Sequence, residues 1–239
     1  MLGAFAVAGG LVAWQGRGRG AARASLDTAR RALNDGFPDS GTVAASALED
    51  AIRLAPRDAE AWGLLAFAYR DIAEGASPQD VSQAIHAGEA AARRALDLDP
   101  RQGDALAALA TLRPYFGDYA AGEDRLLKAL SVDPGNFLAI TQLVGLYQGV
   151  GRVTLSERWN ERAARIDPYS PVPQYRRALK LWGLRQLDAA DQAIERAMPL
   201  WPRHPSVWNA RMMLFAFTGR PAAGLALLDE ERSRPASLK

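Results

Sequence analysis

Apolar and polar positions along most of the chain recur with the period of an amphipathic helix. Four times this pattern closes with a short apolar phrase and a proline, at Pro100, Pro134, Pro168 and Pro202, in steps of 34 residues. Pro56 precedes the first of these by 44 residues, which is one period plus ten. Proline has no amide hydrogen and cannot continue a helix. The spacing therefore predicts a repeated unit that ends with a helix.

Each period divides into two amphipathic segments. A glycine separates them at Gly117, Gly151 and Gly219, and glycine readily takes the left-handed conformation that ends a helix. Ser170 followed by Pro171 predicts an N-cap with proline at the first helical position. One pair of helices cannot bury its apolar face alone, so neighbouring pairs are expected to stack.

The period and the stretch "AWGLLAFAY", with Trp62, Leu65, Ala66 and Tyr69, resemble the tetratricopeptide repeat over roughly residues 22–235. The resemblance implies an all-α, right-handed superhelical solenoid of about six antiparallel helix pairs, preceded by a short apolar N-terminal helix. Residues 22–55 match the consensus weakly, as expected of a cap. Glu231 stands where the family has a small alanine, which predicts a polar last helix before the tail at 236–239.

The second unit holds the ten extra residues, in the stretch "RDIAEGASPQDVSQAIH". Ser77, Pro78 and Asp80 predict a helix start, and that helix is expected to run to about Leu98. Two interpretations stay open. The insertion is either a projecting edge that contacts a partner or a second copy, or it is neutral loop variation.

Composition and motifs give no sign of catalysis. The formal net charge is +2, which does not imply nucleic acid, and the chain has no cysteine. The two histidines, His86 and His204, lie more than a hundred residues apart, and the pair His86 and Glu89 lacks a third metal ligand. We therefore expect no enzyme activity, no cofactor, no metal site and no contact with nucleic acid.

In the tetratricopeptide family the first helices of successive units line a groove that takes a protein or peptide segment. By position, the resemblance places these residues in the groove: Phe67, Arg70, Asp104, Tyr115, Thr141, Gln148, Tyr175, Leu179, Trp182, Asn209 and Met213. The lysine and asparagine clamp for a terminal carboxylate is missing, which favours an apolar segment or a partner helix. Alternatively, Tyr175 and Trp182 are core residues between units.

The first residues, "MLGAFAVAGGLVAWQGRGRG", bear on localisation. Residues 1–15 are interpreted as a complete or partial membrane helix and 16–21 as a Gly/Arg linker. Fourteen helical residues span about 21 Å, less than a hydrocarbon core of about 30 Å. As a complete anchor, its trailing arginines favour a cytoplasmic array. As the second half of a truncated span, it favours a periplasmic one.

The leading functional hypothesis is a non-catalytic scaffold that binds a partner segment and is tethered to a membrane. The alternative is the truncated sensory region of a bacterial winged-helix membrane regulator, which the apolar segment followed by repeats resembles. An enzyme of unrecognised type ranks third. The sequence leaves the partner and the oligomeric state open.

Overall fold

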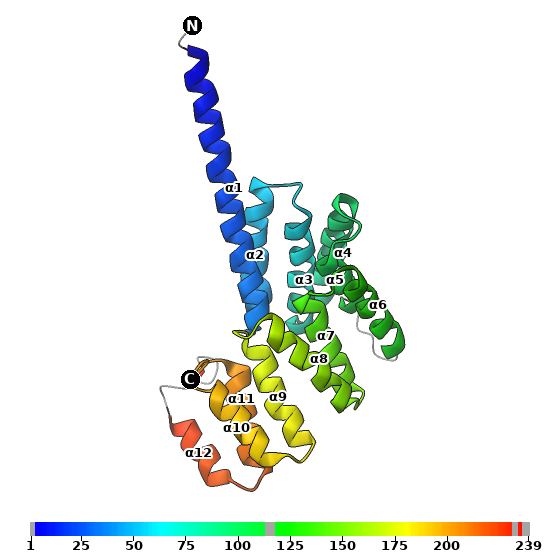
Figure 1. Ribbon diagram of the computed structural model, residues 1–239, viewed down its shortest axis with the longest axis vertical. Coiled ribbons are helices and arrows are strands. Elements are labelled where there is room, and N and C mark those ends of the chain that lie inside the picture. The colour runs from blue at the N-terminus through cyan, green and yellow to red at the C-terminus, as the bar shows by residue number, and fades with distance from the viewer. Residues whose placement is uncertain (1–2, 113–117, 231–233, 236–239) are drawn as a thin grey trace. The chain divides into compact units, whose positions relative to one another are not determined.

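The structure, a computed structural model, describes residues 3–112, 118–230 and 234–235, with the backbone alone for residues 3–17. These residues form twelve helices and contain no strand, which confirms the predicted all-α repeat array (Figure 1). In chain order the helices are α1 (Gly3–Asp35), α2 (Ser40–Leu54), α3 (Ala59–Gly75), α4 (Val81–Leu98), α5 (Gly103–Thr111), α6 (Tyr119–Val132), α7 (Phe137–Gly149), α8 (Val153–Ile166), α9 (Pro171–Gly183), α10 (Leu187–Ala197), α11 (Pro205–Phe217) and α12 (Pro221–Asp229).

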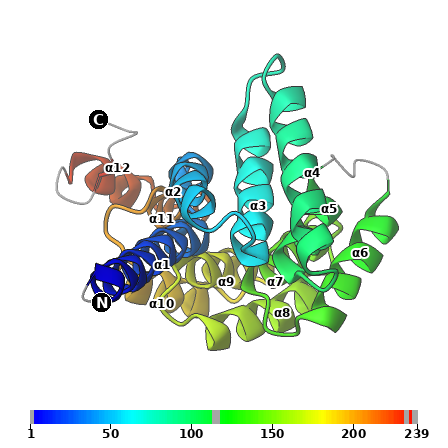
Figure 2. The ribbon, with the colours of Figure 1, turned by 90° about the horizontal axis from the view of Figure 1, so that it is seen from above.

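The described residues divide into two compact units. Unit 1 comprises residues 3–33, 38–112 and 127–134, and unit 2 comprises 34–37, 118–126, 135–230 and 234–235. In unit 1, α3 packs against α2, α4 and α5, and Figure 2 shows α3 and α4 side by side. In unit 2, α9 packs against α8, α10 and α11, and α12 packs on α11. Helix pairs of this kind bury apolar stripes that a single pair leaves exposed.

Local sequence signals place the helix ends. Ser170 is the N-cap of α9 and its Oγ accepts a hydrogen bond from the Val172 amide, with Pro171 at the first helical position, as predicted. Asp58 caps α3 and Asn136 caps α7 through side-chain oxygens that accept backbone N–H groups. Such caps satisfy amides that have no partner within the helix.

In unit 2 the turns between paired helices use a left-handed residue. Gly151 has φ +76° and Gly219 has φ +74°, which confirms their predicted role, whereas Gly117 lies outside the described residues. Midway between them, 34 residues from each, Arg185 has φ 62°. The turn at Arg185, between α9 and α10, therefore has the same left-handed backbone conformation, which is unfavourable for a residue with a side chain.

The insertion leads into α4, which begins at Val81 with Asp80 at the N-cap position, so Ser77 and Pro78 precede the helix rather than open it. The Ser77 hydroxyl lies 2.7 Å from the Asp80 carboxylate, and the Val81 amide donates to the Ser77 carbonyl. α4 then continues to Leu98, the predicted end.

The N-terminal helix differs from the expected division into segments. α1 is continuous from Gly3 to Asp35, so residues 16–21, interpreted as a linker, are helical, and the first half of α1 extends beyond α2 (Figure 1). Each glycine disfavours a helix by only about 1 kcal/mol, and the end of α1 is fixed by the buried side chains of Leu26, Ala29 and Leu33. Among the described residues, no helix combines the length and the apolarity needed to cross a bilayer.

The last described helix differs in character from the polar cap that was expected. α12 ends at Asp229, and Glu231, on which that expectation rested, lies outside the described residues. Leu225 is 63% exposed and Leu228 is 40% exposed. Residues three apart lie on the same helix face, so α12 presents an apolar face rather than a polar one.

Candidate binding surface

Apart from Tyr115, which lies outside the described residues, the candidate site residues lie on the first helices of the pairs. In unit 1 these are the end of α1 with α3 and α5, and in unit 2 they are α7, α9 and α11. The two units differ in the side chains that these helices carry.

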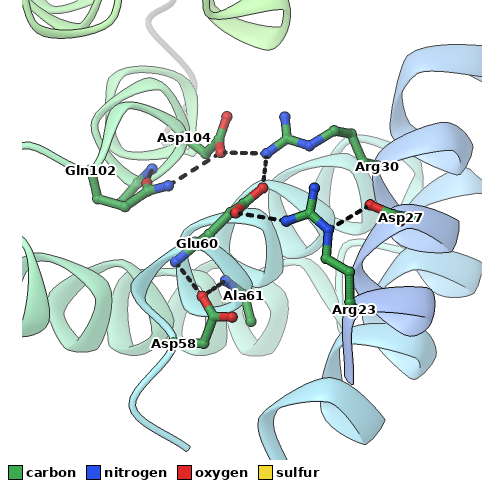
Figure 3. Close-up of polar contacts among 9 residues, drawn as sticks. Arg23, Asp27, Arg30, Asp58, Glu60, Ala61, Gln102 and Asp104 are labelled. Carbon is green, nitrogen blue, oxygen red and sulfur yellow. Dashed lines mark hydrogen bonds and ion pairs between the residues drawn. The ribbon is translucent and has the colours of Figure 1, made fainter. Parts of the chain in front are cut away.

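In unit 1 a charged cluster joins three helices (Figure 3). Arg30 on α1 donates from Nη2 to Glu60 Oε1 on α3 at 2.7 Å and lies 3.5 Å from Asp104 Oδ2 on α5. Arg23, about two turns earlier and 64% exposed, lies 3.6 Å from Glu60 and 3.2 Å from Asp27. Arginine presents several donors in a planar fork, which suits it to two carboxylates at once.

Asp104 is the buried member of this cluster. Its side chain is 5% exposed, and Oδ2 also accepts a hydrogen bond from Gln102 Nε2 at 3.2 Å. The Gln102 side chain in turn caps α5, since its Oε1 accepts the Ala105 amide at 2.6 Å. Burial lowers the pKa of Arg30, but the nearby carboxylates of Asp104 and Glu60 outweigh it, and the net pKa is raised. The charges of this cluster thus compensate one another within unit 1.

Close packing of α3 on α5 holds this arrangement. A Cβ placed at Gly63 would lie 2.2 Å from Gln102 Oε1, so the cap of α5 fits only against a glycine. Gly63 on α3 therefore leaves the space that the Gln102 side chain fills, and Gln102 in turn donates a hydrogen bond to Asp104. The cluster belongs to the framework of unit 1 as much as to its surface.

Most of the groove residues predicted in unit 1 are buried or already form ion pairs within the unit. Phe67 is 2% exposed and lies in the core. The Arg70 guanidinium lies 5.9 Å from the centre of the Phe67 ring. It also pairs with Asp71 at 2.8 Å and with Glu74 at 2.5 Å. Asp104 is buried as described. Tyr115 lies outside the described residues. Phe67 and Asp104 thus present little side-chain surface to a partner, because neighbouring helices cover them.

In unit 2 a hydrogen bond joins α9 to the backbone of α7 at the predicted residue Thr141. Gln148 is exposed, whereas Thr141 is buried and donates its hydroxyl to the Leu138 carbonyl at 2.9 Å. Arg176 on α9 donates from Nη1 to the Thr141 carbonyl at 2.8 Å. This bond links α9 to α7. Of the two predicted residues on α7, Thr141 is buried and Gln148 is exposed to solvent.

Tyr175 and Leu179 line α9 between core and solvent. Both are partly buried and pack on a core of small and branched residues from α9, α10 and α11. The Tyr175 ring stacks on His204 at 6.2 Å, and His204 is buried with Nε2 2.8 Å from the Asp35 carbonyl oxygen. Burial lowers the pKa of His204 despite that hydrogen bond. Tyr175 therefore contributes to packing, as the alternative prediction proposed.

Towards the end of α9 the surface becomes aromatic. The Trp182 ring lies 5.5 Å from the ring of Phe217 on α11, and Phe217 is 66% exposed. Trp182 itself is partly buried against the core. On α11, Asn209 is exposed and its Nδ2 lies 3.9 Å from the sulfur of the half-buried Met213. Trp182 and Phe217 thus form a partly open aromatic pair, and Asn209 and Met213 form a second contact on α11.

Two residues of this region were not among the predicted site residues. Phe217 is one of the most exposed large apolar side chains in the described part, and Arg185 holds the left-handed turn after α9. The sequence carried a signal for Arg185, because the 34-residue step from Gly151 to Gly219 passes through it. The position of Phe217 just before the turn at Gly219 was a weaker signal.

A buried ion pair lies under α9. Lys180 is 2% exposed, and its Nζ lies 3.8 Å from Glu157 Oε2 on α8, with no hydrogen bond to either group. Burial lowers the pKa of Lys180 to about 7, although Glu157 opposes the shift. Burial also raises the pKa of Glu157, against the attraction of Lys180 and Arg177. The charged form of each group is thus only partly compensated.

The described residues contain no group of three histidine, cysteine or acidic side chains that would hold a metal ion. His86 is exposed, and its Nδ1 lies 2.7 Å from the Ser82 carbonyl oxygen one turn earlier on α4. His204 lies in unit 2 as described above. The two histidines therefore each have a local structural environment of their own.

The sequence matches no protein-family model and no curated protein. Among solved structures, the chain is similar to Pseudomonas aeruginosa PilF, with 16% identity, a TM-score of 0.53, and coverage of 87% of this chain and 89% of that one. A tetratricopeptide repeat protein from Parabacteroides merdae has 14% identity, a TM-score of 0.55, and coverage of 90% and 80%. The human IFIT1 dimer with m7Gppp-AAAA has 14% identity and a TM-score of 0.67, and the match spans 87% of this chain but only 49% of IFIT1. These likenesses show a fold like that of tetratricopeptide repeat proteins.

Proposed function

We propose that this chain is a non-catalytic scaffold that binds a protein segment on α7, α9 and α11 of unit 2. The observation that carries the proposal is the open aromatic pair Trp182 and Phe217, whose rings lie 5.5 Å apart with Phe217 66% exposed. Aromatic side chains in partly open settings are the usual anchors of protein interfaces. The repeat fold supports the proposal, since stacked helix pairs present extended surfaces.

Exposed polar side chains on α7 and α11 fit a peptide ligand. Gln148 and Asn209 are exposed, and an amide offers both a donor and an acceptor to a peptide backbone. Met213 adds a flexible apolar contact, and such side chains adapt to different partners. A segment with apolar side chains and a free backbone edge thus matches the chemistry of this surface better than a charged polymer does.

A site-resolved photo-crosslinking experiment tests the proposal. A benzophenone amino acid is placed at Gln148 or Asn209 in the full chain, expressed in cells of the source organism, and crosslinked proteins are identified by mass spectrometry. The control position is Tyr169, which is 84% exposed in the loop between α8 and α9. We expect one protein to crosslink from both test positions and not from Tyr169. Crosslinks from Tyr169 alone, or from none of the three, would contradict the proposal.

Two finer parts of the sequence prediction stay proposals. Membrane attachment through residues 1–15 has its support in the apolar composition of that stretch and the arginines after it. The alternative, a sensory region of a winged-helix regulator, has its support in the same order of apolar segment and repeats. Fractionation of cells, comparing the full chain with a variant lacking residues 1–15, tests the attachment. Equal amounts in the membrane fraction would contradict it.

A further inference from the structure

The turn between α9 and α10 differs from its equivalents in unit 2. At the same place in the preceding and following repeats stand Gly151 and Gly219, whereas here Arg185 takes φ 62°. A residue with a side chain is strained in this conformation and glycine is not. Strained residues of this kind cluster at functional positions. The side chain of Arg185 is therefore a candidate for a role outside the fold.

Arg185 has no acidic partner in the described part of the chain. The arginines at the next position of the flanking turns do: Arg152 lies 3.5 Å from Glu123, and Arg220 lies 2.6 Å from Asp191. The corresponding position after Arg185 is Gln186. The turn between α9 and α10 thus lacks the paired arginine of the flanking turns and carries the exposed Arg185 one position earlier.

Other charges near this turn are accounted for. Asp188 lies in the first turn of α10, where the helix dipole favours a carboxylate. On α9, Arg177 lies 3.6 Å from Glu157, and Arg176 donates to the Thr141 carbonyl. Lys180 is buried above Glu157. The guanidinium of Arg185 is the cation of this end of α9 that is left to solvent.

Apolar side chains accompany this cation. Leu184 is 40% exposed and Leu187 is 42% exposed, on either side of Arg185, and Trp182 lies beside Phe217 as described. A Cβ added at Gly183 would meet nothing within 4 Å, so the backbone next to Trp182 is open. Together Trp182, Leu184, Arg185, Leu187 and Phe217 are called the turn cluster below.

We propose that the turn cluster docks a protein segment in which a carboxylate side chain stands next to aromatic or aliphatic ones. The apolar side chains of that segment contact Trp182 and Phe217, and its Asp or Glu forms a bidentate pair with Arg185. Bidentate arginine–carboxylate pairs are among the strongest polar contacts and set orientation as well as affinity. This inference rests on the proposed scaffold function and names the chemistry of its partner.

Selection from a displayed library of random 12-residue peptides on the immobilised full chain tests this proposal. Enriched peptides are synthesised and their affinities measured for wild type and four variants. R185G removes the cation and relaxes the backbone, and R185K keeps the charge but loses the planar fork. F217S removes the most exposed ring of the turn cluster. Y169S is the matched control, because Tyr169 is 84% exposed but lies in the loop before α9. Circular dichroism confirms that each variant is folded.

We expect the enriched peptides to combine Asp or Glu with Phe, Trp or Leu. Their affinity should fall at least tenfold for R185G and F217S, several-fold for R185K, and less than twofold for Y169S. Peptides that lack acidic residues, or that bind R185G and F217S as tightly as wild type, would overturn the turn cluster and leave the scaffold proposal standing. A library that yields no binding peptide would overturn both.

Discussion

The two units use corresponding helices in different ways. In unit 1 the first helices carry charged side chains that pair with one another, as Arg30 does with Glu60 and Asp104. In unit 2 the first helices carry apolar side chains that face solvent, as Phe217 does, while an ion pair lies buried under α9. In unit 1 the charged cluster on the first helices is thus compensated by short ion pairs, whereas the buried pair Lys180 and Glu157 of unit 2 is poorly compensated.

This difference teaches where binding capacity lies. A partner of unit 1 would have to compete with ion pairs that already satisfy the charges there. A partner of unit 2 covers exposed apolar surface, which is favourable by about 25 cal/mol per Å² removed from water. The repeat fold by itself does not distinguish the two surfaces. The side chains at its variable positions do.

The largest expected effect concerns the buried Lys180. Its pKa in the folded protein is about 7, below the ordinary value of 10.5, so between these values the unfolded chain binds more protons than the folded one. Stability should therefore rise with pH over this window, by up to about 1.4 kcal/mol per pH unit. K180M should flatten this dependence, and the test compares slopes rather than absolute stability, because K180M also leaves the buried Glu157 carboxylate without its cation. Urea unfolding at pH 7, 8 and 9 measures it.

The exposed Lys128 on α6 supplies the control for that experiment. K128M should keep the pH dependence of wild type, since an exposed ammonium is solvated in both states. Parallel plots of unfolding free energy against pH for K180M and wild type would mean that the ammonium of Lys180 is solvated in the folded protein. The electrostatic difference between the two units would then be wrong.

The next effect concerns Arg30 in unit 1. R30M removes the guanidinium that lies 3.5 Å from the Asp104 carboxylate, whose side chain is 5% exposed, and keeps the hydrogen bond from Gln102 Nε2. We expect a loss of about 2 kcal/mol, less than for a fully buried pair because Arg30 is 36% exposed. The double variant R30M/D104N should recover most of it, since an amide needs no counter-charge. Urea midpoints of both variants measure this.

Arg23 provides the matched comparison within the same cluster. It is 64% exposed and its ion pairs are 3.2 and 3.6 Å long, so R23A should change stability by less than about 0.5 kcal/mol. Similar losses for R23A and R30M would show that burial of Asp104 does not decide the energetics of the cluster.

Local signals made much of the fold predictable. The prolines mark the helix ends, and Ser170 caps α9 because capping depends on residues adjacent in the chain. The exposure of a helix face depends on neighbours distant in sequence, which explains why Phe67 was expected in a groove and lies in the core. The same reason applies to α1, where glycines that predict a linker are held in a helix.

The candidate site was predictable in class but not in detail. Trp182 was selected from the pattern and lies beside an open ring, but Phe217 was not selected, because the family positions pointed to Asn209 and Met213 on the same helix. Arg185 breaks the series of glycines at 34-residue steps. A missing glycine signals either a different turn or a strained one, and only the backbone angle decides between them.

The smallest expected effect tests that strain. R185G should raise the free energy of unfolding by about 1 kcal/mol, since a left-handed backbone costs an arginine about 1–2 kcal/mol and glycine adds some entropy to the unfolded chain. The melting temperature should rise by about 2–4 °C. G151A is the converse control, because it places a Cβ at φ +76° with no side chain nearby, and it should lower stability by a similar amount. If R185G melts below wild type, Arg185 stabilises the folded unit 2 directly, and its turn is part of the framework rather than a surface reserved for a partner.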